Sequence, residues 1–515
     1  MGNVGVQAYA ALILWIPICF ALFGTMKPQK AAFVALVVGI MVLPERAMFD
    51  PPALPPFDKQ GFACLAAYFG SVVFLRDKLR RAKTFGGSER FFLIVIVGNF
   101  GTALTNPDPI VIGGGMGYDG IPTPQFVLQG LTYYDIPSMI VRDALGILLP
   151  FHLGRALVRD REEAIIMWTV VVGTMVALLL PMLLELRISP QLHRWVYGAH
   201  ASDFAHAMRG GGFKSTLFLI SGLALAMFLL TSIFGATLLK REGRKVAGLS
   251  GGTLVWGLWG VLLISRNAAS NFYALASIPL VMKRDTSSAA RLSVILALLV
   301  VTYPSLRATQ IFPARELVEF AAKYSVNRAE SLAFRFDNED ILIERASPRK
   351  WFGWGGFNRN RIYDERGKEI SVTDGEWIIR YGIRGTVGFV GSFGLLVWPV
   401  FAAFRRRRKL RDPGTVALVD TMALLVAVSA IDMLPNGFFT VLPYFFAGAL
   451  AGVTEGGTGQ SGGVGPPARP ELLPDPRPDP RFDPRVDPRF APPVGLTGAP
   501  PYGYDPARDP RMGAR

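Results

Sequence analysis

Long apolar stretches alternate with short charged clusters along most of this sequence. A stretch of about 20 apolar residues crosses the hydrocarbon core of a bilayer as a helix. The strict alternation of apolar and polar residues that is typical of barrel strands is not seen, so helical spans are expected. The thirteen predicted spans are 7–25, 31–45, 61–75, 91–106, 136–154, 164–184, 215–238, 247–264, 270–282, 292–304, 385–404, 415–433 and 437–453.

The span at 91–106 is the weakest of the thirteen, because it is short and carries Asn99 and Asn106. Without it, the chain has twelve spans. The pattern therefore predicts an all-α fold, a polytopic transmembrane helical bundle of 12–13 spans. A soluble globular enzyme is excluded by the same apolar stretches.

Basic residues gather on alternate connections between the predicted spans. Short cytoplasmic loops retain Lys and Arg, and every cluster is cytoplasmic if the N-terminus is outside and the C-terminus inside. We therefore expect a multi-pass protein of the bacterial inner membrane with a cytoplasmic C-terminus. The six clusters lie at 27–30, 76–83, 155–161, 240–245, 283–291 and 405–411.

The spans divide the chain into four parts. Residues 1–303 hold ten spans and 385–453 hold three, separated by a large periplasmic loop domain at 304–384. That loop is too long to lack structure, and the helix-like spacing of its apolar residues predicts a helical domain. The C-terminal part, 454–515, is rich in Gly and Pro and contains an Asp-Pro-Arg repeat. This composition predicts a disordered cytoplasmic tail, and its alternating charges argue against nucleic-acid binding.

Composition gives little sign of a metal or cofactor. Charged residues make up only 18% of the chain, and the two cysteines, Cys19 and Cys64, both sit in apolar stretches. They are expected to be small buried hydrophobic residues rather than a disulfide. The four histidines do not have metal-ligand spacing. We therefore expect no bound metal and no cofactor.

Four arginines at or near the outer ends of spans are candidate site residues. Arg266 lies between apolar segments, where outward-facing ends are normally poor in arginine, and this favours a functional group over one that only snorkels to the interface. Arg209 precedes three glycines, which permit close approach to a ligand, and its planar fork suits phosphate. A flexible turn with a solvated arginine explains Arg209 equally well. Arg328 and Arg335 are seven residues apart and share a helix face.

Asp374 is the candidate acid, just before the predicted span at 385–404. A carboxylate at that place can serve as general base for a hydroxyl nucleophile. Aspartate is also a favoured N-cap of a helix. The residues alone favour the cap.

Taken in order, these motifs resemble one known family. They are the Arg209-Gly-Gly turn, the Ser265-Arg266 turn, the glycine and aromatic turn Phe352-Gly-Trp-Gly-Gly-Phe357, and the segment Asp374-Gly-Glu-Trp-Ile-Ile-Arg-Tyr-Gly-Ile-Arg-Gly385. Over roughly residues 200–400 the chain resembles the O-antigen ligase and polymerase family of multi-pass bacterial membrane proteins. The resemblance implies glycan transfer from undecaprenyl pyrophosphate to an acceptor hydroxyl at the periplasmic face, without a metal.

The resemblance also implies roles for individual residues. Arg209 and Arg266 would hold the pyrophosphate, and Arg328 or Arg335 would add to that clamp from the loop. Guanidinium groups aimed at the leaving group would stabilise its growing negative charge. Asp374 would then be the catalytic base, and Arg266 would be the second catalytic residue, acting on the pyrophosphate.

One departure from the family decides between its branches. Family ligases carry a His-Asn pair where this chain has Asp374-Gly375, and residues 304–384 contain no histidine. We therefore expect a polymerase that joins lipid-linked repeat units into a surface polysaccharide or exopolysaccharide. The alternatives are a ligase that transfers finished glycan to a lipid or protein acceptor, and a secondary transporter, although no internal repeat is evident. The expected partners are the lipid-linked glycan, membrane lipid, a chain-length regulator and a flippase.

Overall fold

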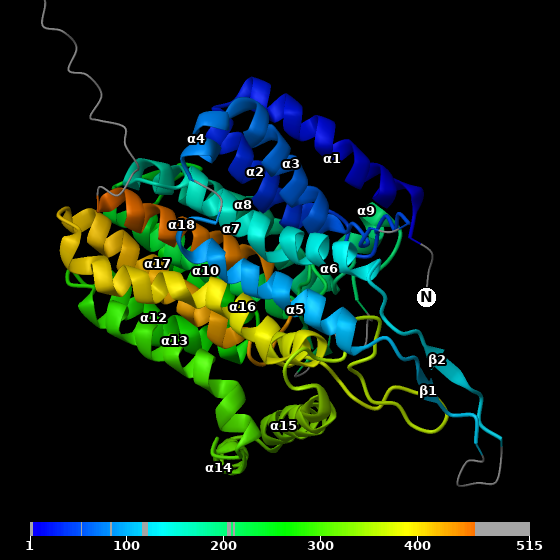
Figure 1. Cartoon of the computed structure of the whole chain (residues 1–515). Helices are drawn as coiled ribbons and strands as arrows, with labels where there is room; N and C mark the ends of the chain where they lie inside the picture. The colour runs from blue at the N-terminus through cyan, green and yellow to red at the C-terminus, as the bar shows by residue number, and fades with distance from the viewer. Residues whose placement is uncertain are drawn as a thin grey trace, which may run out of the picture. The chain divides into compact units, whose positions relative to one another are not determined.

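The computed structural model describes residues 4–52, 54–82, 85–115, 122–202, 208–209 and 212–458. Within these residues, every one of the thirteen predicted spans coincides with a helix (Figure 1). The helices are α1 (Val6–Thr25), α2 (Pro28–Val42), α3 (Lys59–Phe74), α4 (Arg76–Arg81), α5 (Phe91–Thr105), α6 (Asp135–Asp143), α7 (Leu149–Leu157), α8 (Arg161–Ile188), α9 (Leu192–Tyr197), α10 (Gly222–Arg241), α11 (Gly251–Ile264), α12 (Ala268–Met282), α13 (Ser287–Ala308), α14 (Ala314–Ala322), α15 (Val326–Ala346), α16 (Glu376–Arg406), α17 (Pro413–Asp432) and α18 (Val441–Gly457).

The helices have the lengths and compositions of a membrane bundle. In the described part of the chain, seven helices are long and apolar enough to cross a membrane, and three more are shorter apolar helices. The helix α5, which contains the weakest predicted span, packs closely on α16. The chain is therefore a multi-pass membrane protein with an all-α bundle fold. The seven long helices are Val6–Thr25, Asp135–Leu157, Arg161–Ile188, Gly222–Arg241, Ser287–Ala308, Glu376–Lys409 and Pro413–Asp432.

Strands are few and short in the described residues. They form three antiparallel pairs: β1 (Ile110–Ile112) with β2 (Phe126–Leu128), β3 (Met208–Arg209) with β4 (Gly212–Phe213), and β5 (Lys245–Val246) with β6 (Leu249–Ser250). The β1–β2 hairpin projects away from the helices (Figure 1). No sheet therefore contributes to the core of the bundle in this part of the chain.

All six basic clusters lie at one end of the bundle, which we call the basic end. Because the clusters occupy alternate connections, the other connections lie at the opposite end, which we call the loop end. It carries the β1–β2 hairpin, α9, α14 and α15. The clusters are linked to one another through the pairs Lys78–Gln29, Arg155–Ala82, Arg161–Glu242, Arg161–Asp412 and Arg407–Asp285.

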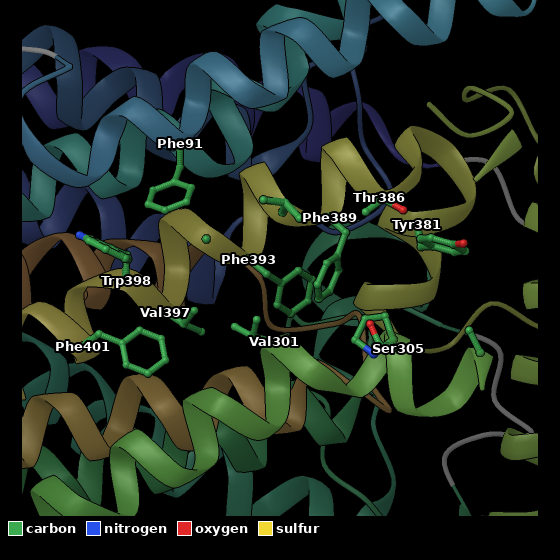
Figure 2. A pocket seen from close by; sticks show the side chains of 14 residues that line it. Phe91, Val301, Ser305, Tyr381, Thr386, Phe389, Phe393, Val397, Trp398 and Phe401 are labelled. Atoms are coloured by element: carbon green, nitrogen blue, oxygen red, sulfur yellow. The ribbon is translucent and has the colours of Figure 1, made fainter. Parts of the chain in front are cut away.

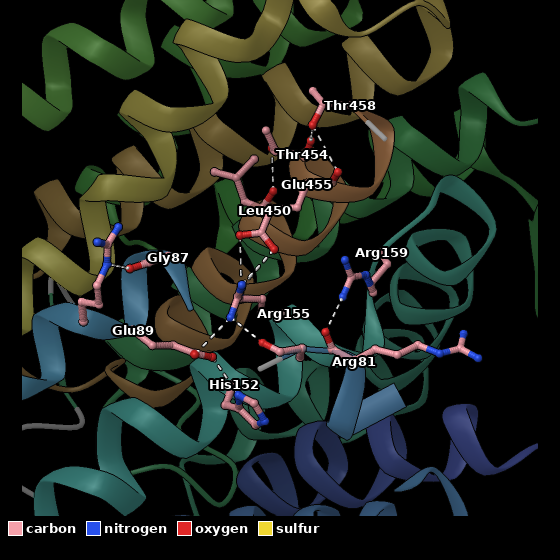
Figure 3. A network of polar contacts seen from close by, with 12 residues as sticks. Arg81, Gly87, Glu89, His152, Arg155, Arg159, Leu450, Thr454, Glu455 and Thr458 are labelled. Atoms are coloured by element: carbon pink, nitrogen blue, oxygen red, sulfur yellow. Dashed lines mark hydrogen bonds and ion pairs between the residues drawn. The ribbon is translucent and has the colours of Figure 1, made fainter. Parts of the chain in front are cut away.

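A buried polar network fixes the last helix at the basic end (Figure 3). Arg155 of α7 pairs with Glu89 at 3.0 Å and with Glu455 of α18 at 3.1 Å. His152 contacts the other oxygen of Glu89 at 2.7 Å. Arg155 is thus neutralised from both sides, as a buried guanidinium requires. Gly448 lets α18 approach α7 closely, because a Cβ there would overlap the carbonyl of Phe151.

Several element boundaries differ from the predicted ones. Helix α13 continues to Ala308 and α16 begins at Glu376, so the loop between them is 309–375 rather than 304–384. Helix α10 begins at Gly222 rather than near 215, because Glu185 accepts hydrogen bonds from the side chain and backbone of residues 215–217 and holds them out of the helix. The predicted tail, 454–515, begins inside α18 and from residue 459 lies outside the described residues.

Candidate functional site

Helix α16 is interrupted where it enters the bundle. Gly385 has φ +62° and ψ −164°, a conformation open only to glycine. A Cβ at Gly385 would overlap the carbonyl group of Trp351 in the preceding loop. Gly353, with φ +68°, meets the same break from the other side, since its Cβ would lie 2.5 Å from the carbonyl carbon of Ile383. Two glycine motifs about thirty residues apart in sequence therefore interlock.

The loop replaces the hydrogen bonds that the break removes from α16. Before the break, the carbonyls of Gly382 and Ile383 accept from N–H groups of the segment 350–355, at 2.8 and 3.0 Å. After it, the N–H groups of Thr386 and Val387 donate to carbonyls of the same segment, at 2.7 and 3.1 Å. Buried backbone groups need such partners inside a membrane protein. The interlocked segment is thus a fixed part of the loop end.

Asp374 lies beside the entrance of α16 and faces α15. Its carboxylate is 3.9 Å from Nε of Arg335, and both side chains are about one third exposed, at 34% and 30%. The expectation that Asp374 caps α16 is wrong, because the helix begins at Glu376 and its N-cap is Gly375. Gly375 sits so close to the carbonyl of Leu434 that a side chain does not fit there. The carboxylate of Asp374 is therefore not used to cap α16.

Arg266 forms the tight turn between α11 and α12. It has φ +57°, unusual for a residue with a side chain, and it is exposed. Its guanidinium lies against Gly212 of the β3–β4 hairpin, where a Cβ would come within 2.6 Å of the guanidinium carbon. Arg209 pairs with Gly212 through its backbone, and its side chain lies outside the described residues. The structure thus brings the Arg266 turn and the Arg209 hairpin together.

The two predicted loop arginines differ in position. Arg335 lies in the interior of α15 and faces Asp374, whereas Arg328 lies in the exposed first turn, about 10 Å away along the helix. Arg335 is also within electrostatic range of Tyr273 on α12 and of Asp432 at the end of α17. Because α12 starts two residues after Arg266, Arg335, Asp374 and Arg266 share the loop end of the bundle.

Glu339 holds α15 onto the bundle, and the sequence analysis did not identify it. Its carboxylate accepts hydrogen bonds from Tyr303 at 2.9 Å, Arg307 at 3.0 Å and Trp377 at 3.0 Å. Burial raises the pKa of Glu339, and the hydrogen bonds from Trp377 and Tyr303 and the charge of Arg307 oppose the rise. The three donors come from α13 and α16, so Glu339 fixes the helix that carries Arg335.

Replacing Glu339 with alanine is expected to lower the free energy of unfolding by about 3 kcal/mol, because Arg307 is left buried without its main partner. Asp340 pairs with the same guanidinium at 2.7 Å but is 52% exposed. Its replacement by alanine should cost under about 1 kcal/mol. Thermal and denaturant unfolding of the purified proteins in detergent measures both. Equal losses in the two variants would contradict the assigned role of Glu339.

A second buried ion-pair cluster joins α16 to α6 and α5 just before the break. Asp143 pairs with Arg380 at 2.7 Å and with Arg384 at 3.6 Å, and accepts a hydrogen bond from Asn99 at 3.0 Å. Sequence reasoning missed this cluster. The pattern that could have revealed it is the spacing of Arg380 and Arg384, four residues apart in an otherwise apolar stretch, which places both on one helix face.

Positive charge gathers around Trp354 in the interlocked loop. Arg345 stacks on its ring at 3.9 Å, and Arg349 lies 5.4 Å from the ring centre. Arg359 is buried and donates to the backbone carbonyls of residues 354, 128, 129 and 108. Burial, with the charges of Arg349 and Arg345, lowers the pKa of Arg359. Neutral carbonyls leave the charge of these arginines available to an anion.

An apolar groove of about 370 Å³ runs along α16 beside α13 (Figure 2). Aromatic and aliphatic side chains line most of it, and its polar residues, Ser305, Tyr381 and Thr386, gather at the loop end. Thr386 donates to the carbonyl of Lys350 at 2.9 Å, so an exposed lysine lies at this mouth. The lining of α16 from Tyr381 to Phe401 extends about 30 Å, roughly the thickness of the hydrocarbon core.

Metal chemistry has no evident donor set in this site. Among the described residues, no group of three or more His, Cys, Asp or Glu side chains is placed to hold a metal ion. Both cysteines are buried.

In comparisons with known proteins, no family model matches this chain, and no curated protein matches it either.

Proposed function

We propose that this chain is a membrane enzyme that polymerises oligosaccharide repeat units carried on undecaprenyl pyrophosphate. The observation that carries the proposal is the apolar groove along α16, whose polar mouth opens at the end where Asp374 and Arg335 meet. A lipid-linked sugar has an apolar tail and a charged, polar head. The groove and its mouth match these two parts in order.

The groove suits an isoprenoid tail because it opens toward the lipid along the membrane-spanning part of α16. Its rings include Phe389, Phe393 and Trp398. Burying apolar surface in such a lining contributes about 25 cal/mol per Å². The groove reaches from the loop end most of the way to the basic end, so a long chain can lie along it. This length distinguishes a lipid site from a site for a compact solute.

Positive charge at the loop end supports binding of a pyrophosphate. Lys350 lies at the groove mouth, and Arg349 and Arg345 lie nearby against the ring of Trp354. Arg266 and Arg335 lie at the same end of the bundle. Guanidinium groups bind phosphate oxygens with two parallel hydrogen bonds, and charge placed before the reaction stabilises a leaving group at little further cost.

The proposed reaction is a sugar transfer in which the acceptor hydroxyl attacks the anomeric carbon of the donor. The carbon–oxygen bond to the pyrophosphate breaks, and undecaprenyl pyrophosphate leaves with the bonding electrons. Asp374 accepts the proton of the attacking hydroxyl, as a general base. Arg335, 3.9 Å from this carboxylate, orients it through their opposite charges. One glycosidic bond forms, one bond between the sugar and the pyrophosphate breaks, and no oxidant or reductant is needed.

Orientation follows from the six basic clusters. Because they all lie at the basic end, the positive-inside rule favours a cytoplasmic basic end and a periplasmic loop end in a bacterial inner membrane. The end of α18 then faces the cytoplasm. The site is on the side where lipid-linked repeat units arrive after a flippase has moved them, and where a chain-length regulator acts on the growing polymer.

Substituting tryptophan for Val301 tests the groove. Val301 lines it and is 44% exposed. Filling space that the lipid tail occupies costs about 1–3 kcal/mol, so KM for the lipid-linked repeat unit should rise roughly tenfold or more. The measurement is polymer formation by purified protein in lipid nanodiscs, with repeat units extracted from a deletion strain.

Ile295 provides the matched control for Val301. It lies on the same helix, is 60% exposed and does not line the groove. Its replacement by tryptophan should leave KM unchanged. Equal effects at both positions would remove the groove from the proposal. A deletion strain with normal polymer that is not attached to its final acceptor would favour the ligase alternative, and an unchanged glycan profile would refute both enzymes.

A further inference from the structure

Helix α14 (Ala314–Ala322) presents an apolar face that the rest of the described chain does not cover. Leu317 and Phe320 of α14 and Tyr324 in the turn directly after it are 39%, 57% and 76% exposed. Phe320 and Tyr324 contact each other, with ring centres 5.2 Å apart. Ile311 before the helix and Val326 after it are also exposed, at 69% and 64%. Exposed apolar patches of this kind mark an interaction surface.

The opposite side of α14 is charged. Arg315 and Glu319 are exposed and lie away from the apolar face on a helical projection, whereas Glu316, four residues before Phe320, lies at the edge of that face. A helix with a strong separation of apolar and charged faces, and little net hydrophobicity, lies in the plane of a membrane interface. A helix that packed into the protein core would instead have its apolar face buried, as α10 has.

The attachment of α14 fixes its depth in the membrane. Helix α13 ends at Ala308, the last residue of a membrane-spanning helix. The link 309–313 extends at most about 17 Å, and Phe312 shortens it by packing on Tyr303 and Phe336, with ring centres 5.0 and 5.9 Å away. In Figure 1, α14 lies beside the loop end of α13, at the flank of the bundle, whereas the β1–β2 hairpin projects beyond it.

We propose that α14 is an interfacial helix whose Leu317, Phe320 and Tyr324 face is buried in the lipid leaflet at the loop end. The occupant of the face is the bilayer that the spans of this chain already cross. The inference stands independently of the proposed enzymatic function, because it uses only the exposed face, its charge pattern and the end of α13. It means that lipid holds α15, which follows α14 in the chain, at a set height above the spans.

Accessibility of a spin label tests this placement in the full chain. The only two cysteines, Cys19 and Cys64, are buried and are first replaced with alanine. Phe320→Cys and Glu319→Cys then provide single labelling sites on adjacent residues, one in the apolar face and one in the charged face, about 100° apart around the helix. In lipid nanodiscs, the label at 320 should relax faster with oxygen than with a water-soluble nickel complex. The label at 319 should show the reverse order.

Two results would overturn the proposal. A label at 320 that is as accessible to nickel as the label at 319 would place the face in water. A label at 320 that is protected from both reagents would mean that protein covers it, such as a second copy of the chain. If the Phe320 variant does not accumulate, Leu317→Cys and Arg315→Cys repeat the comparison on the apolar and the charged face near the start of the helix.

Discussion

Replacing Asp374 with asparagine is expected to lower the rate of glycan polymerisation by about 10²–10⁴-fold, the usual contribution of a general base. The fold should remain intact, because Asp374 does not cap α16 and its contact with Arg335 is long and partly exposed. Asparagine has the same shape but does not accept the proton. The measurement is the initial rate of polymer formation with lipid-linked repeat units in nanodiscs.

Asp337 is the matched control for this substitution. It is an exposed carboxylate on α15, the helix that carries Arg335. Asp337→Asn changes net charge by the same amount and should leave the rate unchanged. Normal activity in Asp374→Asn, at normal abundance in the membrane, would refute the base and leave charge stabilisation by the arginines as the remaining source of catalysis.

The second large effect concerns stability. Gly385→Ala should lower the free energy of unfolding by about 3–5 kcal/mol, the sum of backbone strain and overpacking. The new Cβ would meet the carbonyl of Trp351, and φ at this position is +62°. Relief is possible only if the segment 350–355 withdraws, and its four backbone hydrogen bonds to α16 would then be lost. Unfolding of purified protein in detergent measures the change.

Gly257 is the control, because it lies in α11 with no atom within 4 Å of a Cβ placed there. Gly257→Ala should be neutral or stabilising by up to about 1 kcal/mol. A Gly385 variant that unfolds like the wild type would show that the break in α16 is not held by the loop. Loss of stability in both variants would point to a general intolerance of alanine.

Much of the bundle was predictable because its cause is local. A span needs only a sufficient run of apolar residues, and a basic connection needs only its own lysines and arginines. Even the polar span with Asn99 is present, since a partner on another helix, Asp143, accepts its hydrogen bond. The predicted start of α10 near residue 215 was wrong because its cause is not local. Its start depends on Glu185, a residue about thirty positions away on α8.

The site was predictable only in parts. The glycine turn near Gly353 and the glycine at 385 were both visible, but their interlocking depends on contacts between distant segments. Asp374 was interpreted as a cap because aspartate is a common N-cap, whereas the close approach of Gly375 to Leu434 decides which residue takes that position. Glu339 left no signal, because an acid on an amphipathic helix is usually solvated. Roles for Arg266 and Arg335 in pyrophosphate binding stay predictions.

The contacts of Arg359 couple the projecting β1–β2 hairpin mechanically to the loop beside α16. One side chain holds the carbonyls of Leu128 and Gln129, at the base of β2, together with the carbonyl of Trp354. One side chain therefore joins the β1–β2 hairpin to the segment 350–355 that interlocks with α16. A displacement of the hairpin would therefore be transmitted through Arg359 to Trp354, in the segment that interlocks with α16.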